Sequence, residues 1–350
     1  MNALSAADAI SPAIDRTKRY LFHPFQWGPY LKVCAVAVVT EGFSSNFQFS
    51  SPSGSTSHAT ATSTPSLPST PLTPAMITGI VVGLVAALVV AFLVFYLVTR
   101  LRFAFFHCLL HQTKEIKPGW RLYREQANRF FKLNIIVGLI FLFGIALIAL
   151  PFVFRFLALY RASGPGHHVD LFALFSLIAP LIVLVLALIL LAFATDIVLR
   201  DFMLPHYALE NASARDAWLR VRKDLAAERG SFLLFAVLRT LLPVVAFMAL
   251  LIAVAIPAII VFGILALAFA AFHGMSTDGS GAFSFLGTFF EVAIGIIALG
   301  IGLFAAICLG GPLSIGIRNY SLLFYGGRYQ ALGDILFPPQ PPTSLDATTS

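Results

Sequence analysis

The sequence has little charge and little cysteine. Only 11% of its 350 residues are Asp, Glu, Lys or Arg, whereas a soluble domain usually carries about 25%. This shortage argues against a water-soluble enzyme and against a charge-rich disordered scaffold. Its three cysteines, Cys34, Cys108 and Cys308, are far apart and form no CxxC pair. They therefore argue against a disulfide-stapled secreted module.

Catalytic signatures are also missing. The chain contains no GxSxG, P-loop or HExxH pattern, each of which places a nucleophile, a phosphate or a zinc ion in a defined local structure. We therefore expect no enzyme activity and no cofactor.

What the chain has in abundance is apolar surface. Hydrophobic residues make up 59% of it, and Phe alone occurs 34 times. Five long apolar stretches occupy 76–98, 133–160, 171–199, 231–272 and 283–317, and a weaker one covers 29–43, which includes Lys32 and Glu41. Since about 20 apolar residues cross a bilayer as a helix, the sequence predicts an all-α, polytopic transmembrane helix bundle with cytoplasmic amphipathic helices.

Composition divides the chain into four parts. Residues 1–43 form a basic interfacial helix followed by the weak first span. Residues 44–75 are rich in Ser, Thr and Pro and carry no charge, so we expect a disordered external linker. The helix bundle takes up 76–325, and a Pro-rich cytoplasmic tail takes up 326–350.

Lys and Arg alternate between connections. Four lie in 1–32, eight in 100–132, six in 200–230 and two in the tail, while the connections between these carry none or one. Basic loops stay on the cytoplasmic side, so we expect both termini in the cytoplasm of a bacterium, beneath its inner membrane.

The number of spans depends on 231–272. In one interpretation this segment crosses once and its remainder is an interfacial or re-entrant helix, broken at Pro243 or Pro257, which gives six spans. In the other it is a hairpin, which gives seven spans and an external C-terminus. We prefer six.

Two cytoplasmic connections predict basic amphipathic helices. Ser213 and Asp216 are spaced as a capping box, and Ala217, Trp218 and Val221 then form one apolar side. The basic residues beyond the apolar sides of this helix and of 120–132 are Arg121, Arg124, Arg220, Arg222 and Lys223. Together they predict a positive collar whose partners are the lipid bilayer and its anionic headgroups, rather than nucleic acid.

Several short motifs resemble a known family. They are Pro24-Phe25, Gly119-Trp120, Asn128-Arg129-Phe130-Phe131, Arg200-Asp201-Phe202-Met203-Leu204-Pro205, Ala217-Trp218, Arg318-Asn319-Tyr320-Ser321-Leu322 and Leu336-Phe337-Pro338-Pro339. In these the chain resembles uncharacterised bacterial multi-spanning proteins similar to the membrane domain of glycerophosphoryl diester phosphodiesterases. The resemblance implies a bacterial cytoplasmic membrane protein with many helices. It supplies no catalytic residues, and the chain has no soluble segment long enough for the barrel of those enzymes, so we expect no phosphodiesterase activity.

The spacing of His107, His111 and Glu115 would place all three on one helical face. Such a set can bind a metal ion, although histidine also suits a wet membrane interface.

Other polar residues inside or beside the spans are functional candidates. Arg239 and Glu291 lie within apolar stretches, where charge is expensive and marks polar pathways. They should sit toward opposite membrane faces, so we expect no direct pair. Asp201 and Pro205 follow a span and are candidates for a hinge.

Two functions are compatible with these features. The first is a non-catalytic membrane- or lipid-associated scaffold, or a partner-binding subunit, with other membrane proteins as further partners. The alternative is a transporter or permease-like component built around the Pro-broken segment 231–272, since interrupted helices line substrate sites in carriers.

Overall fold

A computed structural model of the chain describes residues 4–42, 74–162, 171–278 and 282–338. Within these ranges every regular element is helical, as predicted. The elements in chain order are α1 (Ile10–Phe22), α2 (Trp27–Ala37), the π-helix η1 (Val38–Gly42), α4 (Pro74–Leu110), α5 (Ile116–Leu122), α6 (Arg124–Ala162), α7 (Leu171–Ile197), the π-helix η2 (Val198–Met203), α8 (Leu204–Leu209), α9 (Ala214–Ala227), α10 (Arg229–Asp278), α11 (Ala282–Gly326) and α12 (Gln330–Leu336).

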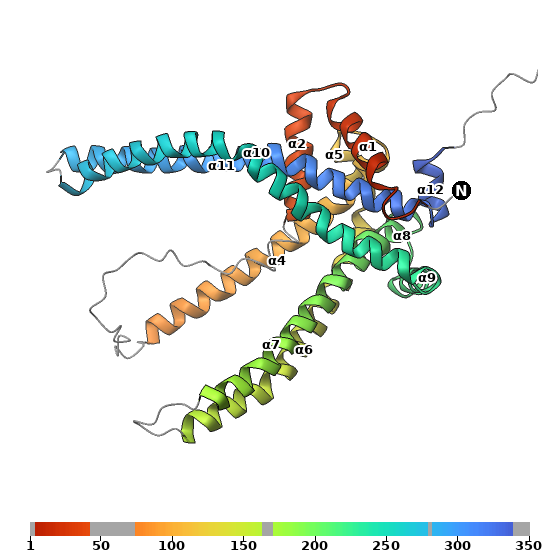
Figure 1. Cartoon of the computed structure of the whole chain (residues 1–350), viewed down its shortest axis with the longest axis horizontal. Coiled ribbons are helices and arrows are strands. Elements are labelled where there is room, and N and C mark those ends of the chain that lie inside the picture. The colour runs from red at the N-terminus through yellow and green to blue at the C-terminus, as the bar shows by residue number, and fades with distance from the viewer. Residues whose placement is uncertain (1–3, 43–73, 163–170, 279–281, 339–350) are drawn as a thin grey trace, which may run out of the picture.

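Three arms extend from one base (Figure 1). The pair α10 and α11 forms the first arm, α4 the second, and the pair α6 and α7 the third, while the short helices gather at the base. Five helical stretches are long and apolar enough to cross a membrane, namely Thr78–Leu110, Arg124–Ala158, Ile178–Leu209, Arg229–Gly274 and Ser284–Gly326. The predicted membrane helix fold is therefore confirmed.

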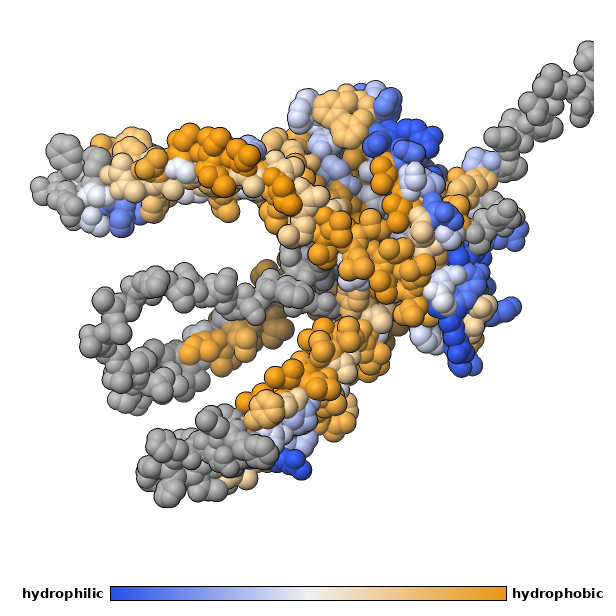
Figure 2. Space-filling view, viewed as in Figure 1, coloured by the Kyte–Doolittle hydropathy of each residue, from blue (hydrophilic) through white to orange (hydrophobic). Residues whose placement is uncertain are grey.

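Apolar side chains cover the outside of the arms (Figure 2). Phe143 on α6 is 71% exposed and Ile252 on α10 is 74% exposed. Surfaces of this kind suit lipid, in which every backbone polar group must be satisfied within its own helix. The buried core lies instead in the base, where the largest enclosed side chains include Tyr207, Phe235 and Phe324.

The predicted first span is not among the candidate spans of the described residues. Residues 27–42 form only the short helix α2 and the π-helix η1, which run across α11 instead of alongside the arms (Figure 1). Cys34 is fully buried and lies so close to Gly311 that a Cβ at that glycine would overlap it. The apolar side of α2 therefore packs against α11 instead of lipid, and the described residues contain five candidate spans instead of six.

Both interpretations of 231–272 are corrected as well. Helix α10 is continuous from Arg229 to Asp278 and keeps Pro243 and Pro257 inside it, so the segment is neither broken nor a hairpin. A proline removes a single backbone hydrogen bond from a helix, and long membrane helices tolerate this.

The ends of the first linker lie far apart. Arg102 donates from Nε to the Thr40 carbonyl at 3.4 Å, so η1 ends beside the base end of α4. Pro74, where α4 begins, is 28 residues before Arg102, or about 42 Å at 1.5 Å per residue. Residues 43–73, which include almost all of the predicted external linker, lie outside the described residues.

The amphipathic helices form with some differences. The Ser213 hydroxyl caps α9 by accepting from the Asp216 N–H at 3.2 Å, and Ala217 and Val221 are fully buried, as expected. Trp218, predicted on the apolar side, is instead 47% exposed. Residues 120–132 are not a separate helix, since they comprise the end of α5 and the first turns of α6. In the predicted tail, α12 packs under α11, where Leu336 approaches Gly326, and the Pro-rich part lies outside the described residues.

Candidate functional site

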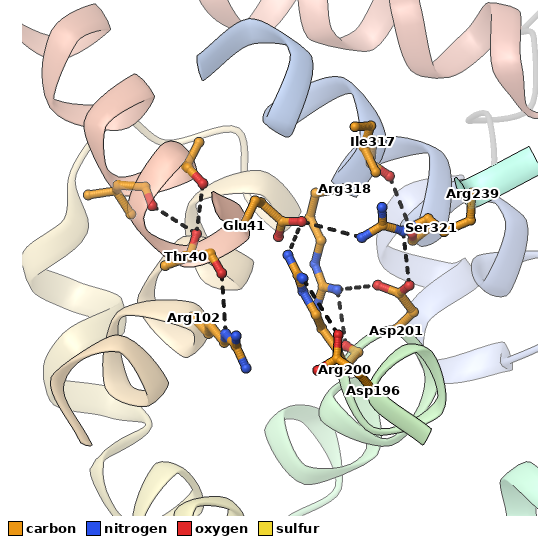
Figure 3. A network of polar contacts seen from close by, with 12 residues as sticks. Thr40, Glu41, Arg102, Asp196, Arg200, Asp201, Arg239, Ile317, Arg318 and Ser321 are labelled. Atoms are coloured by element: carbon orange, nitrogen blue, oxygen red, sulfur yellow. Dashed lines mark hydrogen bonds and ion pairs between the residues drawn. The ribbon is translucent and has the colours of Figure 1, made fainter. Parts of the chain in front are cut away.

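A cluster of charged side chains is buried where the arms leave the base (Figure 3). Five elements supply it, and its members are Glu41 of η1, Asp196 of α7, Arg200 and Asp201 of η2, Arg239 of α10 and Arg318 of α11, with Arg102 of α4 and the Thr40 backbone beside them. We call these residues the charged cluster. Its four arginines and three carboxylates give a formal charge of +1.

Asp201 is the centre of the cluster. Its carboxylate accepts from Arg318 Nη1 at 2.6 Å and from Arg239 Nε at 3.1 Å. Arg318 also donates to the Arg200 carbonyl at 3.0 Å. Asp201 therefore ties η2, which continues from α7, to α10 and α11.

Glu41 forms the second link. Its carboxylate contacts the Arg200 guanidinium and lies 3.3 Å from Arg239 Nη2. Glu41 belongs to η1, which follows α2, whereas its two partners belong to η2 and α10. This pair of contacts therefore attaches the N-terminal helices to the arms.

Both π-helical segments in the described ranges carry cluster residues. Segment η1 holds Glu41, and segment η2 holds Arg200 and Asp201. A π turn contains one more residue than an α turn, which changes the face that the following side chains occupy, and such turns are frequent at functional sites. In η2 all residues from Leu199 to Met203 are buried, so both Arg200 and Asp201 point into the protein.

Exposure differs sharply within the cluster. The side chains of Asp201 and Arg318 are 0% and 3% exposed, whereas that of Asp196 is 41% exposed. The Asp196 carboxylate is 4.0 Å from Arg200 and also interacts electrostatically with Arg102. Arg200 Nε is buried and has no hydrogen-bond partner among the described residues. On one side of the cluster, Asp201 and Arg318 are buried and use each other as hydrogen-bond partners. On the other side, Asp196 and Arg200 can still form hydrogen bonds to a ligand.

That unsaturated side borders a groove of about 590 Å³. Charged side chains form its floor, and the walls are apolar, with Phe193 from α7, Val244, Phe247 and Met248 from α10, and Leu313 from α11. We call it the arm groove. It combines a polar end with an apolar end.

Part of the charged cluster lies where spans end. The apolar stretch of α4 ends at Val98, just before Arg100, and that of α7 ends just before Asp196. Each stretch is about 35 Å long at 1.5 Å per residue, which matches a hydrocarbon core of about 30 Å. Asp196 and Arg102 therefore lie where these apolar stretches end, which is the headgroup level of a membrane-spanning helix, whereas Arg239 lies eight residues inside the apolar stretch 231–272.

A second polar group holds the lower base together. His206 and the Tyr325 hydroxyl are 2.7 Å apart, and that hydroxyl also donates to Asp224 at 3.4 Å. Burial raises the pKa of Asp224, and the bond from Tyr325 opposes this shift. Arg328 pairs with Glu228 at 2.7 Å. These contacts fix α8 and α9 against the C-terminal end of α11.

The predicted intramembrane charges separate as expected. Arg239 joins the charged cluster, whereas Glu291 lies at the tip of its arm, where it is 3.2 Å from His273 Nδ1 and 3.3 Å from the Ser276 hydroxyl. The two residues make no direct pair, because they lie near opposite ends of the α10–α11 arm.

The hinge candidates lie in continuous helix. The backbone is helical from Leu171 through Pro205 to Leu209, and Pro205 occupies the first turn of α8. Asp201 is a central member of the charged cluster. The hinge stays a prediction.

The proposed metal ligands do not share a helical face. The rings of His107 and His111 are 4.5 Å apart, but α4 ends at Leu110 and Glu115 lies just before the next helix, at its N-cap position. Across the ranges that the structure describes, no three His, Cys, Asp or Glu side chains are grouped so as to hold a metal ion.

The collar residues face outward. Arg121, Arg124, Arg222 and Lys223 are exposed. Arg220 is half-exposed and pairs with Glu210. Their binding to headgroups stays a prediction.

Sequence reasoning missed most of the charged cluster. It singled out Asp201 and Arg239, noted Glu41 only as a charge within the weak stretch 29–43, and included Arg200 and Arg318 only as members of short motifs. One feature of the sequence could have indicated the cluster: its charged residues interrupt an apolar stretch or lie at the end of one.

Comparison with known proteins gives a match to a family model. A family model described as a family of unknown function (DUF7544) matches residues 4–335, which agrees with the uncharacterised family indicated by the motifs. No link to glycerophosphoryl diester phosphodiesterases is found. Neither the curated proteins nor the solved structures give a match.

Proposed function

The chain belongs to this family of unknown function (DUF7544), and we propose that it is a non-catalytic scaffold of a bacterial inner membrane. Its arms lie in the bilayer, and its base, which includes the C-terminal helix α12, faces the cytoplasm. In this arrangement Gly42 and Pro74, the described residues on either side of 43–73, lie on opposite sides of the membrane. The basic collar of the base gathers anionic lipid headgroups and presents a fixed platform to other membrane proteins.

The outward face of α9 carries this proposal. Ala217 and Val221 attach the helix to the base, while Arg222 and Lys223 point away from it. Trp218 and Leu219, about half-exposed, add the mixture of aromatic, aliphatic and basic side chains that is typical of helices at a membrane interface.

The collar lies close enough to the bilayer to attract anionic headgroups. Helix α10 begins at Arg229, beside α9, and reaches headgroup level at Arg239, about 15 Å further along at 1.5 Å per residue. The headgroup layer fills roughly 6 Å of this interval. The remaining distance is about one Debye length at physiological salt, so the collar attracts anionic headgroups without being immersed among them.

The test is the number of anionic lipids that the purified full chain retains. We expect native mass spectrometry to show fewer phosphatidylglycerol adducts for the triple variant Arg220→Gln, Arg222→Gln, Lys223→Gln than for the wild type. At one Debye length each basic residue contributes only a fraction of the attraction of about 1 kcal/mol that it has at the surface, so the triple variant sums three such contributions. Arg155→Gln, an exposed arginine near the tip of α6, is the matched control and should change nothing. Equal retention by all three proteins would contradict the proposal.

The transporter alternative loses the feature that motivated it. That hypothesis used a break at Pro243 or Pro257, and α10 is continuous through both. Glu291, its candidate residue, bonds to His273 and Ser276 at the tip of the arm.

A further inference from the structure

We propose that the arm groove binds one zwitterionic aminophospholipid, with its phosphate at Arg200 and Arg239 and its ammonium at Asp196. This goes beyond the scaffold function, because the groove faces the arms and the collar faces away from them. It makes the cluster a headgroup-selective site within the membrane.

The shape of the groove fits an amphiphile. Its floor is charged and its walls are apolar, and its volume of about 590 Å³ is within the range of ligand pockets. A headgroup and the first part of the acyl chains fill that space. The rest of the chains continues along the exposed sides of Phe247 and Met248, which are 52% and 53% exposed.

The phosphate end is set by two arginines. Arg200 lines the groove, its side chain is 6% exposed, and its Nε has no hydrogen-bond partner among the described residues. A buried donor in that state favours a ligand oxygen. Arg239 lies beside it, 12% exposed, and guanidinium groups bind phosphate through paired hydrogen bonds.

The ammonium end is set by Asp196. Its carboxylate is the most exposed acid of the cluster, and Arg200 is 4.0 Å away, beyond hydrogen-bond range. A primary ammonium can donate hydrogen bonds to this carboxylate, whereas a quaternary ammonium cannot. The adjacent positive and negative ends therefore match ethanolamine-type headgroups better than purely anionic or choline-type ones.

Depth agrees with this occupant. Arg102 and Asp196 lie where the apolar stretches of α4 and α7 end, which is headgroup level. A phospholipid in the adjacent leaflet thus meets the cluster with its headgroup and the arms with its chains.

The experiment titrates the detergent-solubilised full chain with phosphatidylethanolamine, phosphatidylcholine and phosphatidylglycerol of one chain length, followed by native mass spectrometry. We expect phosphatidylethanolamine to bind about tenfold more tightly than the other two, a difference of about 1.4 kcal/mol. Asp196→Asn should abolish this preference by weakening phosphatidylethanolamine binding, and it should not weaken phosphatidylglycerol binding, because it removes a negative charge beside Arg200. Asp334→Asn, an exposed carboxylate on α12, should keep it.

Two further measurements keep the proposal falsifiable. Val244→Trp places bulk in the groove from a half-exposed position, and it should weaken binding of phosphatidylethanolamine severalfold. Unchanged binding in that variant, or equal affinity of the wild type for the three lipids, would overturn the proposal. Binding of water-soluble phosphoethanolamine as tightly as the lipid would also overturn it, because the ligand would then be the free headgroup. Because the collar also attracts phosphatidylglycerol, the three titrations are repeated in the triple variant Arg220→Gln, Arg222→Gln, Lys223→Gln, so that failure of the collar and failure of the groove site are distinguished.

Discussion

At the scale of single residues, the charged cluster is held by shared partners. Asp201 serves both Arg239 and Arg318, and Glu41 serves both Arg200 and Arg239. Burying so many charges is costly, and the cost is offset only while each charge keeps a partner. The cluster is consequently sensitive to the loss of any one carboxylate.

Asp201→Asn tests this sensitivity. The substitution leaves Arg318 and Arg239 less compensated in a buried site, so we expect a loss of about 3–5 kcal/mol of unfolding free energy, measured by denaturation in mixed micelles. Asp334→Asn, on the exposed side of α12, should change stability by no more than about 0.5 kcal/mol. Adding Arg318→Met to Asp201→Asn should cost less than the sum of the single changes, since the two residues interact directly. A loss no larger than that of Asp334→Asn would show that Asp201 is not central to the cluster.

At the scale of elements, α2 compensates for a defect in α11. Pro312 lies inside α11 and has no N–H, so it cannot bond to the Cys308 carbonyl four residues earlier. The Tyr30 hydroxyl of α2 donates to that carbonyl at 3.0 Å. A polar group freed by a proline is therefore satisfied by a neighbouring helix, and the same contact fixes α2 across the arm.

Tyr30→Phe should then cost about 1–3 kcal/mol, the usual cost of leaving a buried acceptor unpaired. The effect should be much smaller in a Pro312→Ala background, because the alanine restores an N–H to α11. Unfolding in mixed micelles, applied to the two single variants and the double variant, measures the difference. An equal cost in both backgrounds would show that the hydroxyl acts through some other contact.

At the scale of the whole molecule, the arms and the base occupy different surroundings. The arms expose apolar side chains over most of their length, while the base buries aromatic residues and presents polar ones (Figure 2). The α10–α11 arm is the longest. From Arg239 to His273 it extends about 51 Å at 1.5 Å per residue, which exceeds the hydrocarbon core by about 20 Å. A helix pair of that length crosses at a tilt or extends beyond the headgroups.

The proposed orientation is tested by labelling from outside. In intact cells a membrane-impermeant maleimide should react with Thr277→Cys at the arm tip, and should reach Lys223→Cys in the base only after lysis. Both positions are exposed, and the native Cys34 and Cys108 are buried, so the background from these two is low. Labelling of Lys223→Cys in intact cells would reverse the orientation.

Much of the fold was predictable because hydropathy acts locally. The five apolar stretches predicted the five long helices α4, α6, α7, α10 and α11, and the Ser213 capping box predicted the start of α9. The prediction failed where an apolar segment found a protein partner instead of lipid. Val33, Cys34 and Ala37 of α2 are buried in the protein, and hydropathy alone does not distinguish that environment from a bilayer.

The charged cluster was predictable only in fragments. Asp201 and Arg239 stood out as charges beside or inside apolar stretches, but their partners come from elements far apart in sequence. Arg239 meets Glu41, which is 198 residues away. A single sequence shows the depth of each charge, whereas it does not show which charges face one another.

The sequence by itself determined that the chain builds long apolar helices with basic connections, because burial in lipid and helix length are properties of each segment alone. Only the tertiary structure decided that α2 crosses α11, that α10 continues through two prolines, and that charges from five elements meet beside a groove. Those features depend on packing between distant segments, where one close contact such as Cys34 against Gly311 or one shared carboxylate such as Asp201 selects among arrangements of equal hydropathy.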